Sequence, residues 1–190
     1  MKKNIRTILV IIFVLILAIS MYITTRGSYL EYKELGEKYI EIFKTNTVYK
    51  YSIMAINFVI TFFIMYFANR GIKKGLKVFF DEEKKEIPKL MNKSVSFIIA
   101  AISSIVVGII FAPKFILCAS NVSFEKTDLV FNLDISFYIF VEPLIKMIIS
   151  YIMGIFIFLI AYSIIYYIVI FNRYFDGIDK ETLKKSSLVK

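Results

Sequence analysis

Few residue types in this chain could carry covalent or metal chemistry. Its 190 residues include no histidine and a single cysteine, Cys118. Without imidazole there is neither a histidine general base nor a histidine-based zinc site, and one thiol cannot form an internal disulfide. A nucleophilic cysteine also needs a neighbouring base, which the sequence does not identify. We therefore interpret Cys118 as a small packing residue and expect no enzyme activity, metal or cofactor.

The most distinctive polar positions lie between Asp134 and Pro143, in an otherwise apolar stretch. Asp134 is suited to cap a helix or hold a turn, and Pro143 to a first helical turn. Glu142 and Lys146 are spaced i, i+4 with the acid first, the favourable order for an ion pair on a helix. Either this segment only sets the entry angle of the next helix, or it is an external docking surface. The candidate interaction residues are Asp134, Phe137, Tyr138, Glu142 and Pro143.

The elements that would position these residues are membrane helices. Hydrophobic residues make up 58% of the chain and its mean hydropathy is +0.71, whereas soluble domains are about 45–50% apolar. Four runs without charge, of 18 to 25 residues, match the length of about 20 residues that crosses a bilayer as a helix. Unpaired backbone groups are costly in lipid, which favours the helix. The sequence predicts an all-α polytopic bundle, one membrane domain over 1–190, with spans at 7–24, 51–69, 94–112 and 147–171.

The first run has two interpretations. Lys2, Lys3 and Arg6 precede it, and Ala18-Ile-Ser20 resembles a signal-peptide cleavage site. Its apolar stretch is longer than the roughly 7–15 residues of a signal-peptide core. We favour an uncleaved anchor, with cleavage as the alternative.

The distribution of basic residues predicts the orientation. With the N-terminus inside, the cytoplasmic segments 1–6, 70–93 and 172–190 hold 16 Lys and Arg, and the external segments 25–50 and 113–146 hold 8. The positive-inside rule then places both termini in the cytoplasm. We attribute the net charge of +9 to an anionic inner leaflet rather than to nucleic acid.

Two connecting segments carry a helical apolar face. Residues 28–45 predict an amphipathic helix, either on the outer membrane surface or packed on another domain, through Tyr32, Leu35, Tyr39, Ile42 and Phe43. In 70–93 the apolar positions are Ile72, Leu76, Phe79 and Phe80. The lysines around them would suit the inner leaflet, but the ordinary positive-inside signal explains them better.

The third run has a small residue at every fourth position through four helical turns: Ser96, Ala100, Ser104, Gly108 and Ala112. We call these five residues the small-residue strip. A strip of this kind forms a groove that lets a second helix approach closely. Ser150 and Gly154 in the fourth run offer a possible partner face.

The runs offer little for transport. They hold no charged residue that would mark a substrate pathway, and no Gly or Pro breaks one in the paired manner of transporters. The hydroxyls of Thr61, Ser103, Ser104 and Ser163 are expected to bond carbonyls of their own helices. From Pro143 to Phe171 is roughly 43 Å of helix, too long for a straight span, so we expect a bend after an interfacial stretch.

A family resemblance follows from these motifs. The sequence Asp134-Ile-Ser-Phe-Tyr138, followed by Pro143, resembles the signature of uncharacterised protein family 0182, large bacterial multi-pass membrane proteins. The family's first external segment looks similar to Leu30, Tyr32, Glu34, Leu35 and Gly36. This chain differs at Glu31 and Leu144, where Trp and an aromatic residue are usual in the family.

The resemblance implies a bacterial cell membrane protein that continues into further helices and a large external domain. It implies no catalytic residue, because the family has no established activity. We therefore expect an anchor or scaffold portion of a larger surface protein. The alternative is a subunit of a transporter or channel whose pathway forms on oligomerisation. The expected partners are the bilayer and the remainder of a longer protein, and no nucleic acid.

Overall fold

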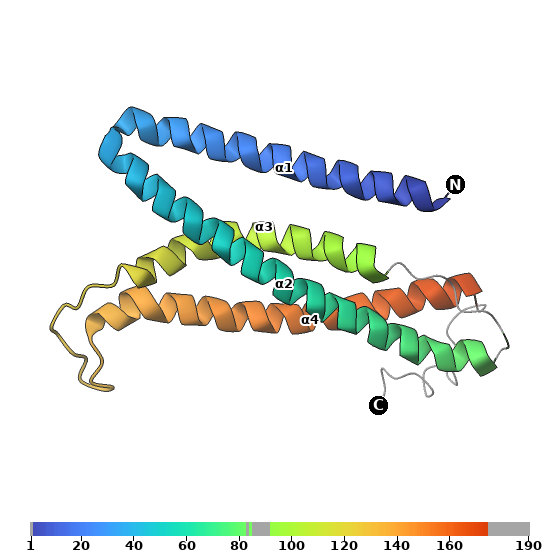
Figure 1. Cartoon of the computed structure of the whole chain (residues 1–190). Coiled ribbons are helices and arrows are strands. Elements are labelled where there is room, and N and C mark those ends of the chain that lie inside the picture. The colour runs from blue at the N-terminus through green and yellow to red at the C-terminus, as the bar shows by residue number, and fades with distance from the viewer. Residues whose placement is uncertain (1, 83, 85–91, 175–190) are drawn as a thin grey trace.

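A computed structural model describes residues 2–82, 84 and 92–174. Its four long helices, drawn in Figure 1, are α1 (Lys2–Leu35), α2 (Glu37–Glu82), α3 (Asn92–Ala119) and α4 (Glu142–Tyr174). A π-helical turn, η1 (Phe137–Val141), leads directly into α4. Each long helix is long and apolar enough to cross a membrane, which confirms the predicted all-α class. The predicted cytoplasmic segments fall partly at 83, 85–91 and 175–190, outside the described residues.

The connection between α1 and α2 corrects the single helix predicted over 28–45. α1 ends at Leu35 and α2 begins at Glu37, and Gly36 between them has φ +116°, a conformation that glycine adopts without the cost of a Cβ. The chain reverses there (Figure 1). The apolar residues at the end of α1 therefore pack against those at the start of α2. The rings of Tyr29 and Tyr32 lie 5.7 and 5.5 Å from that of Phe43.

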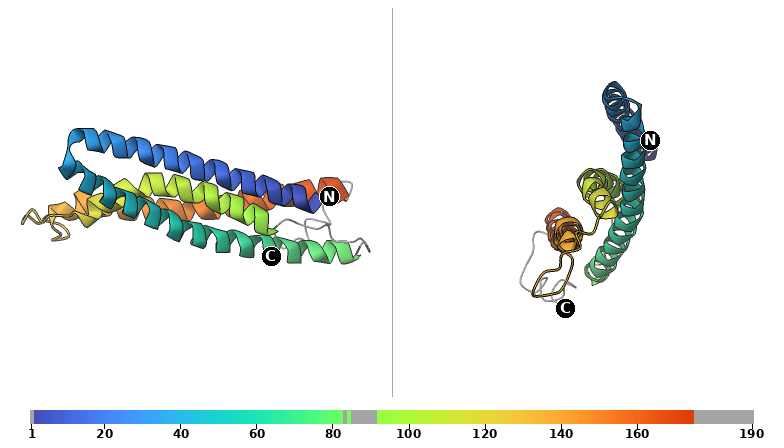
Figure 2. Two further views of the ribbon diagram at one scale, coloured as in Figure 1. Left: turned by 45° about the horizontal axis from the view of Figure 1, so that its top comes forward. Right: turned by 90° about the vertical axis from the view of Figure 1, so that its left-hand side faces the viewer.

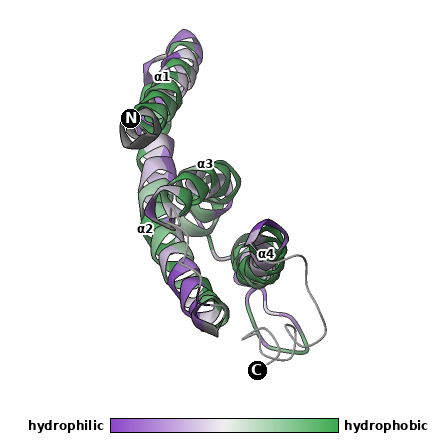
Figure 3. Cartoon of the chain, turned by 90° about the vertical axis from the view of Figure 1, so that its right-hand side faces the viewer, coloured by the Kyte–Doolittle hydropathy of each residue, from purple (hydrophilic) through white to green (hydrophobic). Residues whose placement is uncertain are grey.

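α2 is the central element of the bundle. At 46 residues it is about 69 Å long, and it contacts α1, α3 and α4. Figure 2 shows α3 and α4 on one side of α2, with α1 farthest from α4. Figure 3 shows that α1, α3 and α4 are hydrophobic along most of their length, whereas α2 has hydrophilic stretches. The most apolar stretch of α1 has no buried residue, as suits a helix that faces lipid.

A buried apolar cluster joins the last part of α2 to the last part of α4. Its members are Ile72, Leu76, Phe79, Phe80, Tyr167, Ile170 and Phe171. Leu76 and Phe80 are fully buried, and the rings of Phe79 and Phe171 are 5.2 Å apart, edge to face. The four α2 residues share a helical face, as the sequence indicates, and this face packs on α4.

The stretch from Pro143 to Phe171, for which a bend was predicted, lies within one continuous helix, α4. It runs without interruption over 33 residues, about 50 Å. The irregularity comes before it, in η1, where the Glu142 N–H donates to the Phe137 carbonyl. A proline ring clashes with the carbonyl four residues back in a regular helix. A wider π-helical turn just before Pro143 relieves this crowding.

Candidate functional site

The small-residue strip of α3 faces α2. All five of its residues are buried: Ser96, Ala100, Ser104, Gly108 and Ala112. The two helices approach closely at Gly108, where an added Cβ would stand 2.2 Å from Cγ of Met54 on α2. Ser150 and Gly154 of α4, the partner face suggested by the sequence, are exposed instead. The groove in α3 thus accommodates α2 and not α4.

Asn57 connects three helices inside the bundle. Its side-chain amide on α2 donates to Oγ of Ser103 on α3, at 3.2 Å. Its Oδ1 accepts a hydrogen bond from the hydroxyl of Tyr151 on α4, at 2.6 Å. Asn57 is buried, and a buried amide in an apolar environment is costly unless it is hydrogen-bonded. This Asn–Ser–Tyr set fixes the relative positions of α2, α3 and α4.

A second Asn–Ser–Tyr set repeats this arrangement further along α2. The amide of Asn69 donates to Oγ of Ser96 at 3.0 Å, and its Oδ1 accepts from the hydroxyl of Tyr162 at 2.7 Å. The two asparagines are 12 residues apart, or about 18 Å along the helix. The three helices are therefore joined by side-chain hydrogen bonds at two levels.

Sequence reasoning missed both sets, although a signal was present. Asn57 and Asn69 are the only side-chain amides in the four charge-free runs, and polar side chains in membrane helices usually bond across helices. The hydroxyl of Ser104 does bond its own helix, at the Ala101 carbonyl, as expected. Thr61 and Ser103 depart from that expectation, because their hydroxyls lie near Tyr151.

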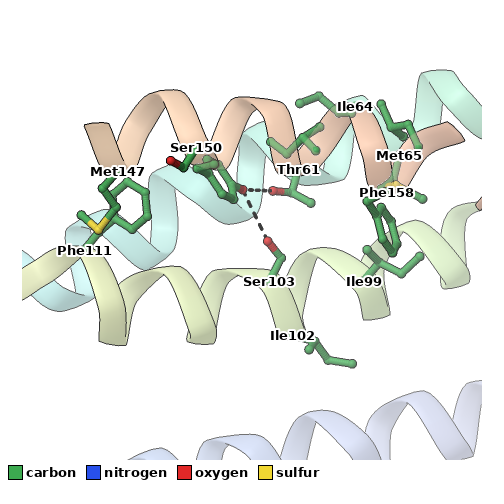
Figure 4. A pocket seen from close by; sticks show the side chains of 14 residues that line it. Thr61, Ile64, Met65, Ile99, Ile102, Ser103, Phe111, Met147, Ser150 and Phe158 are labelled. Carbon is green, nitrogen blue, oxygen red and sulfur yellow. Dashed lines mark hydrogen bonds between the residues drawn. The ribbon is translucent and has the colours of Figure 1, made fainter. Parts of the chain in front are cut away.

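A cavity of about 640 Å³ opens between α2, α3 and α4 beside Tyr151. Figure 4 shows Thr61 and Ser103 reaching toward one tyrosine from different helices. The other lining residues are mainly apolar, and no lining residue is charged: Thr61, Ile64, Met65, Ile99, Ile102, Ser103, Phe111, Met147, Ser150, Tyr151, Gly154, Ile155, Phe158 and Leu159. A concave, largely apolar surface with a few convergent polar groups is typical of small-molecule sites.

Tyr151 is the titratable residue among those lining the cavity. Within residues 2–82, 84 and 92–174, no three Asp, Glu or Cys side chains are grouped to hold a metal ion. The hydroxyl groups that line the cavity can bind and orient a ligand.

The loop between α3 and η1 is held by two carboxylates. Asp134 accepts hydrogen bonds from the Ser123 hydroxyl at 2.5 Å and from the Ser136 backbone N–H at 2.7 Å. These bonds hold the pKa of Asp134 well below its ordinary value. Asp128 accepts from the Tyr138 hydroxyl and from the N–H groups of the 130–131 turn, which lowers its pKa too.

The predicted interaction residues lie where the loop enters η1, in η1 itself and in the first turn of α4. Asp134 caps the turn that enters η1, through Ser136. The Phe137 ring lies 5.5 Å from that of Tyr138. The Glu142–Lys146 ion pair forms at 2.8 Å, and Pro143 lies in the first turn of α4.

The most exposed apolar residues of the loop precede the interaction segment that the sequence suggested. Leu129 is fully exposed, and Val130 and Phe131 are 80% and 72% exposed. We call these three residues the loop tip. Asp128 fixes it through bonds to the N–H groups of Val130 and Phe131, so a rigid turn presents three apolar side chains.

Comparison with known proteins identifies the family. The model of the uncharacterised protein family UPF0182 matches residues 5–189. This chain belongs to the UPF0182 family. It is 24% identical to a UPF0182 protein of Caldicellulosiruptor saccharolyticus, over 90% of this chain and 19% of the relative. It is 28% identical to one of Clostridium acetobutylicum, over 94% of this chain and 21% of the relative.

The chain spans about a fifth of the length of these two UPF0182 relatives. The match lends direct support to the resemblance found through the Asp134–Tyr138 motif. No solved structure matches the chain.

Proposed function

We propose that this chain is the membrane anchor of a larger UPF0182 surface protein, and that its loop tip docks the external part of that protein. The observation that carries the proposal is the loop tip itself, Leu129 to Phe131. Its side chains are exposed while its backbone is fixed by hydrogen bonds to Asp128. Exposed apolar residues held in one conformation suit an interface. Because the loop is already ordered in the free chain, binding a partner costs less conformational entropy.

The proposed occupant is the external part of the longer protein. The two relatives have about four-fifths of their length outside the matched region, so most of a full-length member lies beyond the helices described here. The two Asn–Ser–Tyr sets support an anchoring role. They hold α2, α3 and α4 in one arrangement, and α4 continues directly from the loop through η1. A docked domain would thus be held in a fixed position relative to the membrane.

The test uses a chimera in which this chain replaces the matched region of the Clostridium acetobutylicum relative, with a protease site at the junction. After cleavage, the distal part should co-purify with the chain. Changing Leu129, Val130 and Phe131 together to serine should abolish co-purification without lowering the melting temperature, because these side chains contact little of the anchor. The matched control is Val122→Ser, which is 66% exposed but lies outside the tip. Equal recovery from the triple variant and the control would contradict the proposal.

The proposal also requires that the loop lie outside the cell. A reporter that is active only outside the cytoplasm, fused after Ser123, should be active, and the same reporter fused after residue 185 should be inactive. The expectation comes from the excess of Lys and Arg in the cytoplasmic segments. The opposite pattern of activity would refute the orientation.

A further inference from the structure

Three hydroxyl groups from three helices converge at the wall of the cavity. Oγ1 of Thr61 and Oγ of Ser103 lie 3.3 and 3.5 Å from the Tyr151 hydroxyl oxygen. Good O–H···O hydrogen bonds are about 2.5–3.0 Å long, so both contacts are long. The Tyr151 hydroxyl donates its own hydrogen to Asn57 at 2.6 Å. Thr61 and Ser103 therefore both approach the same oxygen without reaching good hydrogen-bond distance.

An oxygen atom supplied by a ligand would complete this arrangement. Placed in the cavity among the three groups, it would accept hydrogen bonds from Thr61 and Ser103 at shorter distance than Tyr151 allows. The ligand would carry no charge, because no cavity-lining residue is charged and an unpaired buried charge is very costly. Thr61 and Ser103 lie near the midpoints of the runs 51–69 and 94–112, so this oxygen would sit deep in the bilayer.

The size of the cavity favours a single lipid chain over a protein helix. A helix about 10 Å across that spans about 30 Å of hydrocarbon occupies roughly 2,000 Å³, several times the cavity's 640 Å³. The cavity falls within the range of about 300–1,000 Å³ that is usual for small-molecule sites. Its apolar wall, including Ile99, Ile102 and Phe158, matches an aliphatic chain.

We propose that this cavity binds a neutral long-chain lipid through one hydroxyl group, whose oxygen accepts hydrogen bonds from Thr61 and Ser103 and whose hydrogen is donated to the Tyr151 oxygen. The site is independent of the docking role of the loop tip. The proposed ligand class is a lipid whose hydroxyl group can lie inside the membrane, such as a fatty alcohol. The chain of the lipid lies between α3 and α4, where Gly154 leaves open space: a Cβ added there meets no atom within 4 Å.

The test uses the full chain in lipid nanodiscs and a diazirine-bearing palmityl alcohol. The control probe is a hydrocarbon of the same length with the same diazirine. The alcohol should label α4 residues near Tyr151, and excess unlabelled palmityl alcohol should compete with it. Loss of both hydroxyls in Thr61→Val with Ser103→Ala should weaken alcohol labelling roughly five- to hundredfold, the equivalent of two hydrogen bonds, and leave hydrocarbon labelling unchanged.

Filling the cavity provides an independent variant. Gly154→Leu should abolish alcohol labelling. Gly71→Leu is the matched control, because a Cβ at Gly71 also meets no atom within 4 Å and Gly71 does not line the cavity. Both should keep the parent's melting temperature.

Three results would overturn the proposal. Equal labelling by alcohol and hydrocarbon in the unsubstituted protein would show a groove for bulk lipid chains and no role for the hydroxyls, whatever the variants do. Labelling that Gly154→Leu leaves intact would place the probe elsewhere. Failure of excess alcohol to compete would mean that no saturable site exists, as when bulk lipid or another protein helix fills the cavity.

Discussion

The packing of α3 on α2 can be tested by one substitution made at two glycines. Replacing Gly108 by alanine adds a Cβ at 2.2 Å from Met54 Cγ and 2.8 Å from its Cε, whereas carbon atoms in contact are normally about 3.5–4.0 Å apart. Cγ is the first atom beyond Cβ, so Met54 can avoid the clash only by changing χ1 or by letting the helices separate. At Gly154 the same Cβ meets nothing within 4 Å.

The magnitude follows from two opposing effects. Alanine favours a helix over glycine by about 0.8–1.0 kcal/mol, and this gain applies at both positions. Overpacking costs about 1–3 kcal/mol, and only Gly108→Ala pays it. Gly154→Ala should therefore be neutral or stabilising, and Gly108→Ala should be less stable than Gly154→Ala by about 1–3 kcal/mol.

The assay is reversible unfolding by SDS in mixed micelles, with both variants measured beside the parent. Equal stability of the two variants would refute the close approach at Gly108. Ala101 lies off the small-residue strip but is not a suitable control for Gly108. Its side chain is buried, with 8% exposed, so enlarging it would also disturb packing.

Three further predictions concern the polar sets, the loop and the buried cluster. In a double-mutant cycle of Asn57→Ala and Tyr151→Phe, the coupling energy should be about 0.6 and at most about 1.7 kcal/mol, and zero coupling would contradict the 2.6 Å bond. Because the Ser123 hydroxyl and the Ser136 N–H lower the pKa of Asp134 below 3.8, the stabilisation is complete above pH 3.8 and is lost as the pH falls toward the folded-state pKa. Pepsin cleavage within 120–136, normalised to an unstructured peptide, should rise over that acidic range, and a pH-independent normalised rate would count against it. Leu76→Ala should cost about 2–5 kcal/mol in SDS unfolding, whereas Val78→Ala, at a 52% exposed position, should cost far less; similar losses would place Leu76 outside the core.

Local periodicity carried most of the helix information. The charge-free runs predicted four spanning helices, because a chain in lipid must pair its backbone groups within each segment. The four-residue spacing of the small-residue strip placed its members on one face, and the structure buries all five. The face formed by Ile72, Leu76, Phe79 and Phe80 was likewise readable from spacing. The Asp134–Tyr138 motif and Pro143 indicated the family that the match over residues 5–189 shows.

The partner of each face was decided by the tertiary structure. The strip packs on α2 and not on Ser150 and Gly154, and the Ile72 face packs on α4. Lipid tails are as apolar as another helix, so an apolar face does not specify what covers it. The α1–α2 hairpin likewise depends on Gly36 at positive φ. The helical spacing of apolar residues across 28–45 gives no indication of this turn.

The polar connections also needed three-dimensional information. Asn57, Ser103 and Tyr151 are separated by 46 and 48 residues in the chain, and no local pattern links residues at such distances. The asparagines alone signal that a partner must exist, because an unpaired amide in lipid is costly. Which hydroxyl groups satisfy them depends on how α2, α3 and α4 cross, and the same crossing leaves the cavity beside Tyr151.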